Sequence, residues 1–357
     1  MSRALYLILA VALVCWTQAP LLAQTQEQLI AGAKKEGKLV VYASATAPQL
    51  QMYFTAFNKR YPFIKTEFFR TGKQKLVSKI LFEEQAKQHI ADLIHTSVIE
   101  TNILKKRGVL SRHVPLESAS YPAQYKDPEG FWTSVYASGT LLGFNSRQVK
   151  RAEAPKVYED LLNPRWKGGL AIDTNKIEWF AMLLKIKGRS FMEKLAAQSP
   201  SPKIEWFAML LKIKGRSFME KLAAQSPSPR DGNTLVLQLL AAGEYPVATG
   251  VYEYSIEDLK NRGAPVDWIG LEPVITYTVA VSLPSQPPRP FAAKLFIEWL
   301  LSKEGQEVIN QYGRVPIRDD VESKYGKILK QHKLLMTDVD LGQREVEINE
   351  TFRKLFR

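Results

Sequence analysis

The sequence predicts an α/β fold of two lobes, and three observations carry that prediction. Short apolar runs typical of buried strands alternate with stretches whose apolar residues have helical spacing. Short polar loops follow the first three of these strands. A strand-like segment late in the chain, over 274–281, is placed to return to the first lobe. The length of 357 residues fits two domains of about 100–200 residues each.

The first half of the chain alternates between predicted helices and strands. The first helix ends at Gly37, and Leu50, Tyr53 and Phe57 mark the apolar face of the second. Strands that alternate with helices imply a parallel sheet, with ligand-facing loops at the carboxyl ends of the strands. The predicted elements are a helix over 28–35, a strand over 38–44, a helix over 47–60, a strand over 64–69, a helix that opens at Gly72, and a strand over 91–95.

The loops after these three strands, 44–46, 70–72 and 95–97, form the first candidate site. They supply hydroxyl groups, backbone donors and one positive charge, which suits the recognition of phosphate, phosphonate or carboxylate. The helix near Gly72 offers free backbone N–H groups to an anion. Arg70 is equally well explained as a solvated surface residue. The candidate residues are Ser44, Thr46, Arg70, Thr71, Gly72 and Ser97.

The second half of the chain predicts the crossover segments and the second lobe. Aromatic and β-branched residues over 131–145 are typical of a strand or crossover. A proline-rich break over 284–290 precedes a helix. The other predicted elements are strands over 169–173, 245–251 and 274–281, and helices over 234–242, 254–261 and 291–301. We divide the chain into a first lobe of 24–130 with about 275–310, a second lobe of 131–274, and C-terminal helices over 311–357.

The N-terminus predicts export. Arg3 precedes an apolar run over 4–16, which is shorter than the about 20 residues of a membrane span and fits the core of a secretory signal peptide. We expect residues 1–23 to be removed after Ala23, which gives a periplasmic protein. An uncleaved membrane anchor is the alternative. Cys15 could carry a lipid, although the small residue that usually precedes such a Cys is missing.

The composition excludes several classes of function. A single Cys permits no internal disulfide, no Cys-rich zinc module and no thiolate iron–sulfur cluster. The formal net charge of +13 permits an anionic partner, but the basic residues are spread along helices without interleaved aromatics, and an exported protein meets no nucleic acid. The four His lack zinc-binding spacing, and no nucleophile elbow, P-loop or dinucleotide motif is present. We therefore expect no cofactor.

A tandem duplication interrupts the second lobe. Residues 176–202 and 203–229 are identical at all 27 positions. A solenoid would need three or more stacked units, so a recent in-frame duplication or an assembly error in the gene sequence explains the repeat better. One copy then fills a native slot as a helical hairpin, and the other is an insertion. We expect a protein that lacks either copy to be at least as stable.

Several phrases, in this order and spacing, resemble the extracellular solute-binding proteins of ABC importers. The most similar branch includes ferric-iron-, phosphonate- and thiamine-binding periplasmic proteins. The resemblance covers the mature chain except the second repeat copy and the last ~35 residues. The phrases are KEGKLVVYAS (35–44), FNKRYPFIKTEFFRTG (57–72), ADLIHTS (91–97), YEDLLNPRWKGGLAID (158–173), LLAAGEYPVAT (239–249), NRGAPVDWIGLEPV (261–274) and AAKLFIEWLLSKEGQ (292–306).

The resemblance implies a type II periplasmic-binding fold. In that fold two lobes are joined by crossover hinge strands, and the ligand is captured in a central cleft by lobe closure. It also implies a monomer that delivers a small molecule or ion to a membrane permease and catalyses no reaction. The rivals are an enzyme on the same two-lobed scaffold and a non-functional allele damaged by the duplication. The export signal and the lack of a Cys in the mature chain argue against the enzyme.

The resemblance also raises iron as a ligand. Ferric-binding relatives carry a His after the first strand, a Glu after the third, and two adjacent tyrosines. Here the His position falls at Thr46, the Glu position at Ser97, and the tyrosine pair at Glu253 and Tyr254. Because Fe(III) favours anionic oxygen ligands, Glu253 and Tyr254 with the neighbouring Tyr252 remain an alternative iron site. In an extended segment Tyr252 and Tyr254 would point to opposite faces.

The preferred interpretation is an anionic organic ligand or an oxyanion, because Thr46 and Ser97 replace the iron ligands of the relatives. Asp173 suits either a ligand amine or the cap of a following helix. The candidate residues from the second lobe are Tyr136, Asp173, Asn175, Tyr252 and Tyr254.

Overall fold

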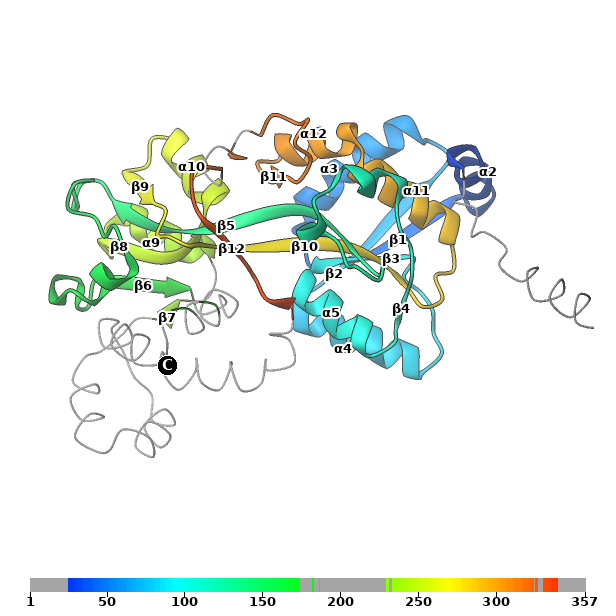
Figure 1. Ribbon diagram of the computed structural model, residues 1–357, viewed down its shortest axis with the longest axis horizontal. Helices are drawn as coiled ribbons and strands as arrows, with labels where there is room; N and C mark the ends of the chain where they lie inside the picture. Colours follow the sequence, from blue (N-terminus) through cyan, green and yellow to red (C-terminus); the bar gives the residue numbers. More distant parts are fainter. Residues whose placement is uncertain are drawn as a thin grey trace, which may run out of the picture.

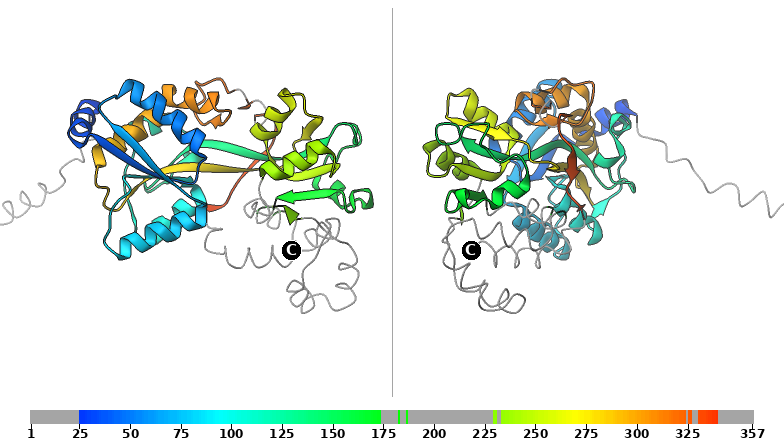
Figure 2. Two further views of the ribbon diagram at one scale, coloured as in Figure 1. Left: turned by 180° about the vertical axis from the view of Figure 1, so that it is seen from behind. Right: turned by 60° about the vertical axis from the view of Figure 1, so that its left-hand side comes forward.

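Two long strands, β5 (Thr133–Asn145) and β10 (Val274–Pro284), run antiparallel through the middle of the molecule and connect two groups of elements (Figure 1). The structure is a computed structural model, and it describes residues 25–173, 182, 186, 229–230, 233–323, 325–326 and 330–339. The expected signal peptide, nearly all of the duplicated block and Asn175 lie outside the described residues. Figure 2 shows both groups of elements from behind.

The first lobe contains a parallel sheet, as the alternation of strands and helices predicts. β1 pairs in parallel with β2 on one side and with β3 on the other, and β10 joins antiparallel to β3. β3 begins two residues later than predicted. There the buried Asp92 carboxylate accepts N–H groups from Val40 and Arg289. The elements are α2 (Gln26–Glu36), β1 (Lys38–Ala43), α3 (Ala47–Arg60), β2 (Lys65–Arg70), α4 (Lys73–Gln85), β3 (Leu93–Ser97), α5 (Val98–Lys106), β4 (Leu110–Ser111), η1 (Leu116–Ser120), η2 (Ala123–Tyr125), α11 (Pro290–Leu301) and α12 (Lys303–Gln311).

Aromatic side chains dominate the core of the first lobe. Phe57 on α3 packs against Phe296 and Trp299 on α11, with ring centroids 4.9 and 5.4 Å apart. Each buried aromatic side chain removes roughly 150–250 Å² from water, which makes such residues the main source of packing energy. The predicted apolar face of α3 is confirmed, since Leu50, Tyr53 and Phe57 are all buried.

The second lobe is built around β8, which pairs antiparallel with β5 and in parallel with β6. β9 also pairs with β5, and α9 and α10 contact β8 and β9. The elements are η3 (Tyr158–Leu162), η4 (Pro164–Trp166), β6 (Leu170–Asp173), β7 (Pro229–Arg230), α9 (Asn233–Ala242), β8 (Val247–Tyr252), α10 (Glu253–Asn261) and β9 (Val266–Ile269).

The C-terminal region differs from the helices expected over 311–357. Its described residues include two short strands, β11 (Val315–Pro316) and β12 (Leu334–Met336), which pair with β5 and β10. The long crossover strands offer free backbone edges for this pairing, and neither strand has an apolar run long enough to be recognised from sequence. No described helix is both long enough and apolar enough to cross a membrane.

Candidate functional site

The three loops at the carboxyl ends of β1, β2 and β3 lie together, as expected from the parallel pairing of these strands. Ser44 and Thr96 share a hydrogen bond of 2.9 Å between their hydroxyl oxygens. The Nε of Arg70 donates to the carbonyl oxygen of Ala45 at 3.1 Å. Arg70 is exposed, and this hydrogen bond also joins the loop after β2 to the loop after β1.

The other candidate residues of these loops have different environments. The Thr46 hydroxyl shares a 2.8 Å hydrogen bond with the Tyr312 hydroxyl, which follows α12. Ser97 is buried, and its hydroxyl donates to the Glu100 carboxylate, so it is engaged within its own helix. Thr71 donates its backbone N–H to Ala43, and Gly72 is the N-cap residue of α4.

The helices that begin at these loops have no side-chain cap. Thr46, Gly72 and Ser97 are the N-cap residues of α3, α4 and α5, and none of them accepts a backbone N–H of its helix through a side chain. By contrast, Thr25 caps α2 and Ser302 caps α12. Uncapped helix N-termini keep their backbone donors and positive dipole ends available to a negative group.

Tyrosines from the second lobe and the crossover strand form the opposite part of the site. β8 ends at Tyr252 and α10 begins at the next residue, so the chain turns between Tyr252 and Tyr254. Their rings consequently stack at 5.5 Å with an interplanar angle of 17°, and the ring of Tyr277 on β10 lies 5.1 Å from that of Tyr252. The segment is not extended between them, so the condition under which Tyr252 and Tyr254 would point to opposite faces is not met.

Arg314 is the central charged residue of the site, and the sequence analysis missed it. Its side chain is 5% exposed, and its Cζ lies 3.7 Å from the ring centroid of Tyr254 and 5.2 Å from that of Tyr136. One nitrogen, Nη2, donates to Oε1 of Gln49 at 3.2 Å. Nε and Nη1 are buried without a hydrogen-bond partner among the described residues. An unpaired buried N–H is costly, so these two donors are suited to a ligand.

The histidine and tyrosine side chains behind Arg314 are neutral at pH 7. Burial lowers the pKa of His95 to about 4, and its ring lies between those of Tyr53 and Tyr136. Burial also raises the pKa of Tyr136 and of Tyr277 above the usual value of a tyrosine. Gln49 donates to the Tyr53 hydroxyl at 2.6 Å and thereby presents its carbonyl oxygen to Arg314. Arg314 thus keeps its charge against a neutral background, where an electrostatic interaction is only weakly screened.

Glu253 lies next to this cluster with an unusual environment. Its carboxylate is fully buried, and neither oxygen has a hydrogen-bond partner among the described residues. Burial raises the pKa of Glu253 to about 7, although the positive charge of Arg314 acts in the opposite direction. An ionised carboxylate is strongly disfavoured without water or a partner.

Tyr136 does not lie in the second lobe, where the sequence analysis placed it, whereas Asp173 does. Tyr136, assigned there to the second lobe, belongs to the part of β5 that pairs with β10 and β11, and it is buried in the core of the first lobe. Asp173 ends β6 and pairs in register with Arg230 of β7. The structure does not describe its side chain.

The described part of the chain contains no metal site built from the side chains that usually bind metal ions. No group of three or more His, Cys, Asp or Glu residues is placed there to hold a metal ion. Most of the oxygen-bearing side chains near Arg314 are phenols, from Tyr136, Tyr254, Tyr277 and Tyr312, and the others are the Gln49 amide and the Glu253 carboxyl.

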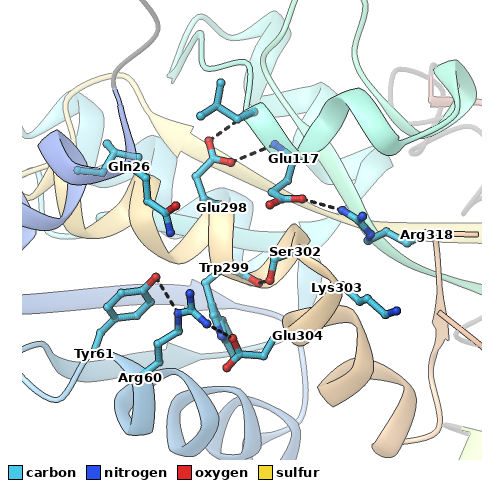
Figure 3. A pocket seen from close by; sticks show the side chains of 12 residues that line it. Gln26, Arg60, Tyr61, Glu117, Glu298, Trp299, Ser302, Lys303, Glu304 and Arg318 are labelled. Carbon is cyan, nitrogen blue, oxygen red and sulfur yellow. Dashed lines mark hydrogen bonds and ion pairs between the residues drawn. The ribbon is translucent and has the colours of Figure 1, made fainter. Parts of the chain in front are cut away.

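A separate pocket of about 360 Å³ lies on the first lobe between α2, α3, α11, α12 and η1 (Figure 3). Its charged side chains pair with one another: Arg60 with Glu304 and Arg318 with Glu117, both at 2.6 Å. The Glu298 carboxylate accepts the backbone N–H groups of Leu116 and Glu117. The pocket therefore offers a ligand few unpaired groups, and the buried Arg314, with two nitrogens that lack a partner among the described residues, marks the better site.

Comparison with known proteins adds a family match. The family model of the bacterial extracellular solute-binding proteins matches residues 90–341. An uncharacterised protein of Haemophilus influenzae is 26% identical over 294 residues, which are 79% of this chain and 78% of that protein. A probable ABC transporter periplasmic-binding protein of Sinorhizobium fredii is 26% identical over 33% of each chain. An Fe(3+)-binding periplasmic protein of Serratia marcescens is 25% identical over 44% of this chain and 46% of that protein.

Solved structures of low identity share the fold. The ferric binding protein of Campylobacter jejuni has a TM-score of 0.73 at 18% identity, covering 89% of this chain and 100% of that chain. The periplasmic binding protein AfuA of Actinobacillus pleuropneumoniae, with fructose-6-phosphate bound, has a TM-score of 0.70 at 22% identity, covering 90% and 99%. The fold is therefore the mixed α/β periplasmic-binding fold that the resemblance implied.

Proposed function

The chain belongs to the bacterial extracellular solute-binding proteins, and from that premise we propose that it captures a small anion between its two lobes. A protein of this family holds its ligand and breaks no bond. Membership of the family does not say which ligand is bound. The choice of an anion is supported by the chemistry of the site.

One observation carries the proposal: the buried guanidinium of Arg314 has two donors without a partner among the described residues. A guanidinium presents parallel N–H groups that match a carboxylate or a phosphate. The uncapped N-termini of α3, α4 and α5 add backbone donors on the side of the first lobe. Together these groups compensate negative charge and disfavour a cationic ligand.

Capture works through contacts with both lobes. Arg314 already bridges them, since it bonds Gln49 on α3 and stacks on Tyr254 in α10. An anion that contacts Arg314 and the first-lobe loops at once stabilises the arrangement in which the lobes are close. A ligand shifts a conformational equilibrium only by its difference in affinity for the two states, and these added contacts provide that difference.

Delivery follows from the kind of protein that the chain resembles. The Sinorhizobium relative is named as a probable component of an ABC transporter, which supports a membrane permease as the partner. The predicted signal peptide, cleaved after Ala23, would place a monomer in the periplasm.

Ferric iron is the second candidate, and the gathering of tyrosines favours it. Phenolate oxygens are good ligands for Fe(III), and one relative is named as an Fe(3+)-binding protein. Two features oppose it: the Arg314 charge repels a cation, and burial raises the pKa of Tyr136 and Tyr277, which disfavours phenolates. A visible colour on adding Fe(III), lost in Tyr254→Phe and kept in the control Tyr245→Phe, would overturn the anion.

The test of the anion is a thermal-shift and calorimetric screen of the mature protein against phosphate, phosphonates, dicarboxylates, thiamine and Fe(III). We expect an anion to raise the melting temperature by mass action. Arg314→Gln should weaken that anion about 10- to 100-fold, because hydrogen bonds to a charged group contribute about 1.5–3 kcal/mol.

Two controls make this result specific. Arg262→Gln removes an exposed arginine of the second lobe and should bind normally. Arg314→Lys keeps the positive charge but lacks the parallel N–H groups of the guanidinium, so its anion affinity should lie between those of the wild type and Arg314→Gln. Equal anion affinity in all four proteins would refute the proposal, provided that circular dichroism shows them folded.

A further inference from the structure

A polar side chain interrupts the apolar face of α3. Gln49 is 0% exposed, although the other buried residues of this helix, among them Leu50, Tyr53 and Phe57, belong to the apolar core of the first lobe. A buried amide loses its hydrogen bonds to water, so it is costly unless partners within the protein replace them. The partners of Gln49 therefore indicate what this amide does.

Tyr53 fixes the orientation of the Gln49 amide. The Nε2 of Gln49 donates to the hydroxyl oxygen of Tyr53, one helical turn later, at 2.6 Å. Tyr53 is itself completely buried, and its ring packs edge-on against that of His95 with the centroids 6.1 Å apart. A reversed amide would turn its NH₂ group towards the guanidinium of Arg314, where donor would meet donor. The carbonyl oxygen of Gln49 consequently faces Arg314.

Two contacts fix the guanidinium of Arg314 in different ways. Its Cζ lies 3.7 Å from the ring centroid of Tyr254, and this stacking sets the plane of the group but leaves it free to turn within that plane. The hydrogen bond from Nη2 to Oε1 of Gln49, at 3.2 Å, removes this remaining freedom. The directions of Nε and Nη1, which have no partner among the described residues, therefore depend on Gln49.

The first turn of α3 also holds the chain segment that carries Arg314. Thr46, the N-cap residue of the helix, shares a 2.8 Å hydrogen bond with the hydroxyl of Tyr312. One helical turn thus contacts this segment twice, through Thr46 and through Gln49. Binding groups are held most precisely by side chains that lie on rigid elements and are themselves fixed by packing and hydrogen bonds.

We infer that Gln49 is a positioning residue for anion capture: its one hydrogen bond to Arg314 sets the direction in which the guanidinium presents its other donors to the ligand. The inference rests on the proposed function and adds the residue on which the orientation of Arg314 depends. Gln49 acts on the anion only through this guanidinium, which gives a specific test.

A double-mutant cycle provides that test, by calorimetry on the mature protein with inorganic phosphate, methylphosphonate and succinate. Gln49→Met is similar in size but lacks the acceptor, and it should weaken the anions that bind the wild type about 5- to 10-fold. In the Arg314→Gln protein the same change should alter affinity less than about twofold, because no guanidinium is left to orient. Gln51→Met, at an exposed position on α3, is the matched control and should bind normally.

A second variant keeps the size of the buried side chain unchanged. Gln49→Glu places a carboxylate beside Arg314, where it competes with the ligand for the same positive charge. At pH 8 it should weaken anion binding at least about tenfold, whereas the exposed Gln51→Glu should bind as the wild type does. Circular dichroism checks that each variant is folded.

The outcomes separate this inference from the proposed function. If Gln49→Met binds as the wild type does, or weakens binding equally with and without Arg314, the positioning role is refuted while anion capture stands. Normal anion affinity of Gln49→Glu would refute it in the same way. If Arg314→Gln binds as tightly as the wild type, or none of the anions binds the folded wild type, the proposed function fails and this inference fails with it.

Discussion

At the scale of single residues, the site depends on side chains whose burial conflicts with their polarity. Among the residues that the structure describes, the buried Arg314 has two donors without a partner and the buried Glu253 has two oxygens without a partner. Unpaired buried polar groups destabilise a fold, so proteins retain them mainly where they serve binding or catalysis. Both residues border the same tyrosines, which is why we place the function there and not in the self-paired pocket of the first lobe.

Glu253 makes a prediction about stability and pH. Its pKa is raised to about 7 in the folded protein, so folding favours the protonated form. The resulting stability is fully present below about pH 4.5 and is lost as the pH rises towards 7, because the unfolded chain gains by ionising. Glu253→Gln should therefore be more stable than the wild type above pH 7, by up to about 3 kcal/mol.

Urea unfolding of both proteins between pH 4 and 8 checks this expectation. The exposed Glu244→Gln on the same lobe is the control, and its unfolding free energy should follow that of the wild type. A difference between Glu253→Gln and the wild type that does not grow with pH would contradict the raised pKa.

At the scale of elements, the site is assembled where strands turn into helices. Helices α3, α4 and α5 begin directly after β1, β2 and β3, and α10 begins directly after β8. None of these four helices has a side-chain cap at its N-terminus. The turn that follows the end of α12 adds Tyr312 and Arg314 to the site, with Gly313 between them.

Gly313 makes a prediction about this turn. Its φ is +86°, and an added Cβ would lie 3.0 Å from the ring of Tyr325 and 3.9 Å from Cβ of Tyr254. Gly313→Ala should lower the free energy of unfolding by about 1–2 kcal/mol, because a side chain is strained at positive φ. It should also weaken anion binding by displacing Arg314.

Gly72→Ala is the matched control for Gly313→Ala. Gly72 has a φ of −66°, and an added Cβ meets nothing within 4 Å. Chemical unfolding should show a change within about 0.5 kcal/mol. Equal stability of the two variants would show that the turn at Gly313 is not strained by a side chain.

At the scale of the whole molecule, three segments run between the two lobes. β5 and β10 are the long crossovers, and β12 runs beside β10 before residue 339 reaches the first lobe (Figure 1). Asn102 on α5 donates to the carbonyl oxygen of Val339, and the Thr337 hydroxyl donates to Thr276 on β10. Movement of the lobes must therefore bend all three segments together.

The duplicated block makes a prediction at this scale. β6 ends just before the block, β7 contains its last residue, Pro229, and the two strands are hydrogen-bonded neighbours, so the two ends of the block lie side by side. Deleting 203–229 joins Pro202 to Arg230 and thus restores the Pro-Arg sequence of β7. The melting temperature should stay the same or rise, and anion affinity should not change.

Deletion of both copies, 176–229, is the control and should destabilise the protein, because we expect one copy to be part of the second lobe. A marked fall in melting temperature on deleting 203–229 alone would show that the second copy is integrated. Anion binding that appears only after this deletion would instead identify the duplication as damaging.

The sequence by itself determined the alternation of strands and helices at the start of the first lobe, the two long crossover strands, the parallel pairing of β1 with β2 and β3, and the family. These features depend on the local spacing of apolar residues and on short sequence motifs, and both can be recognised without knowing which residues are in contact. The meeting of loops 44–46, 70–72 and 95–97 followed from the same pairing. Only the tertiary structure decided the centre of the site, because Arg314 carries no local signal and reaches Tyr254 and Gln49 across long sequence separations. The stacking of Tyr252 on Tyr254 likewise depends on a strand that turns into a helix between them, a boundary that periodicity does not resolve to one residue.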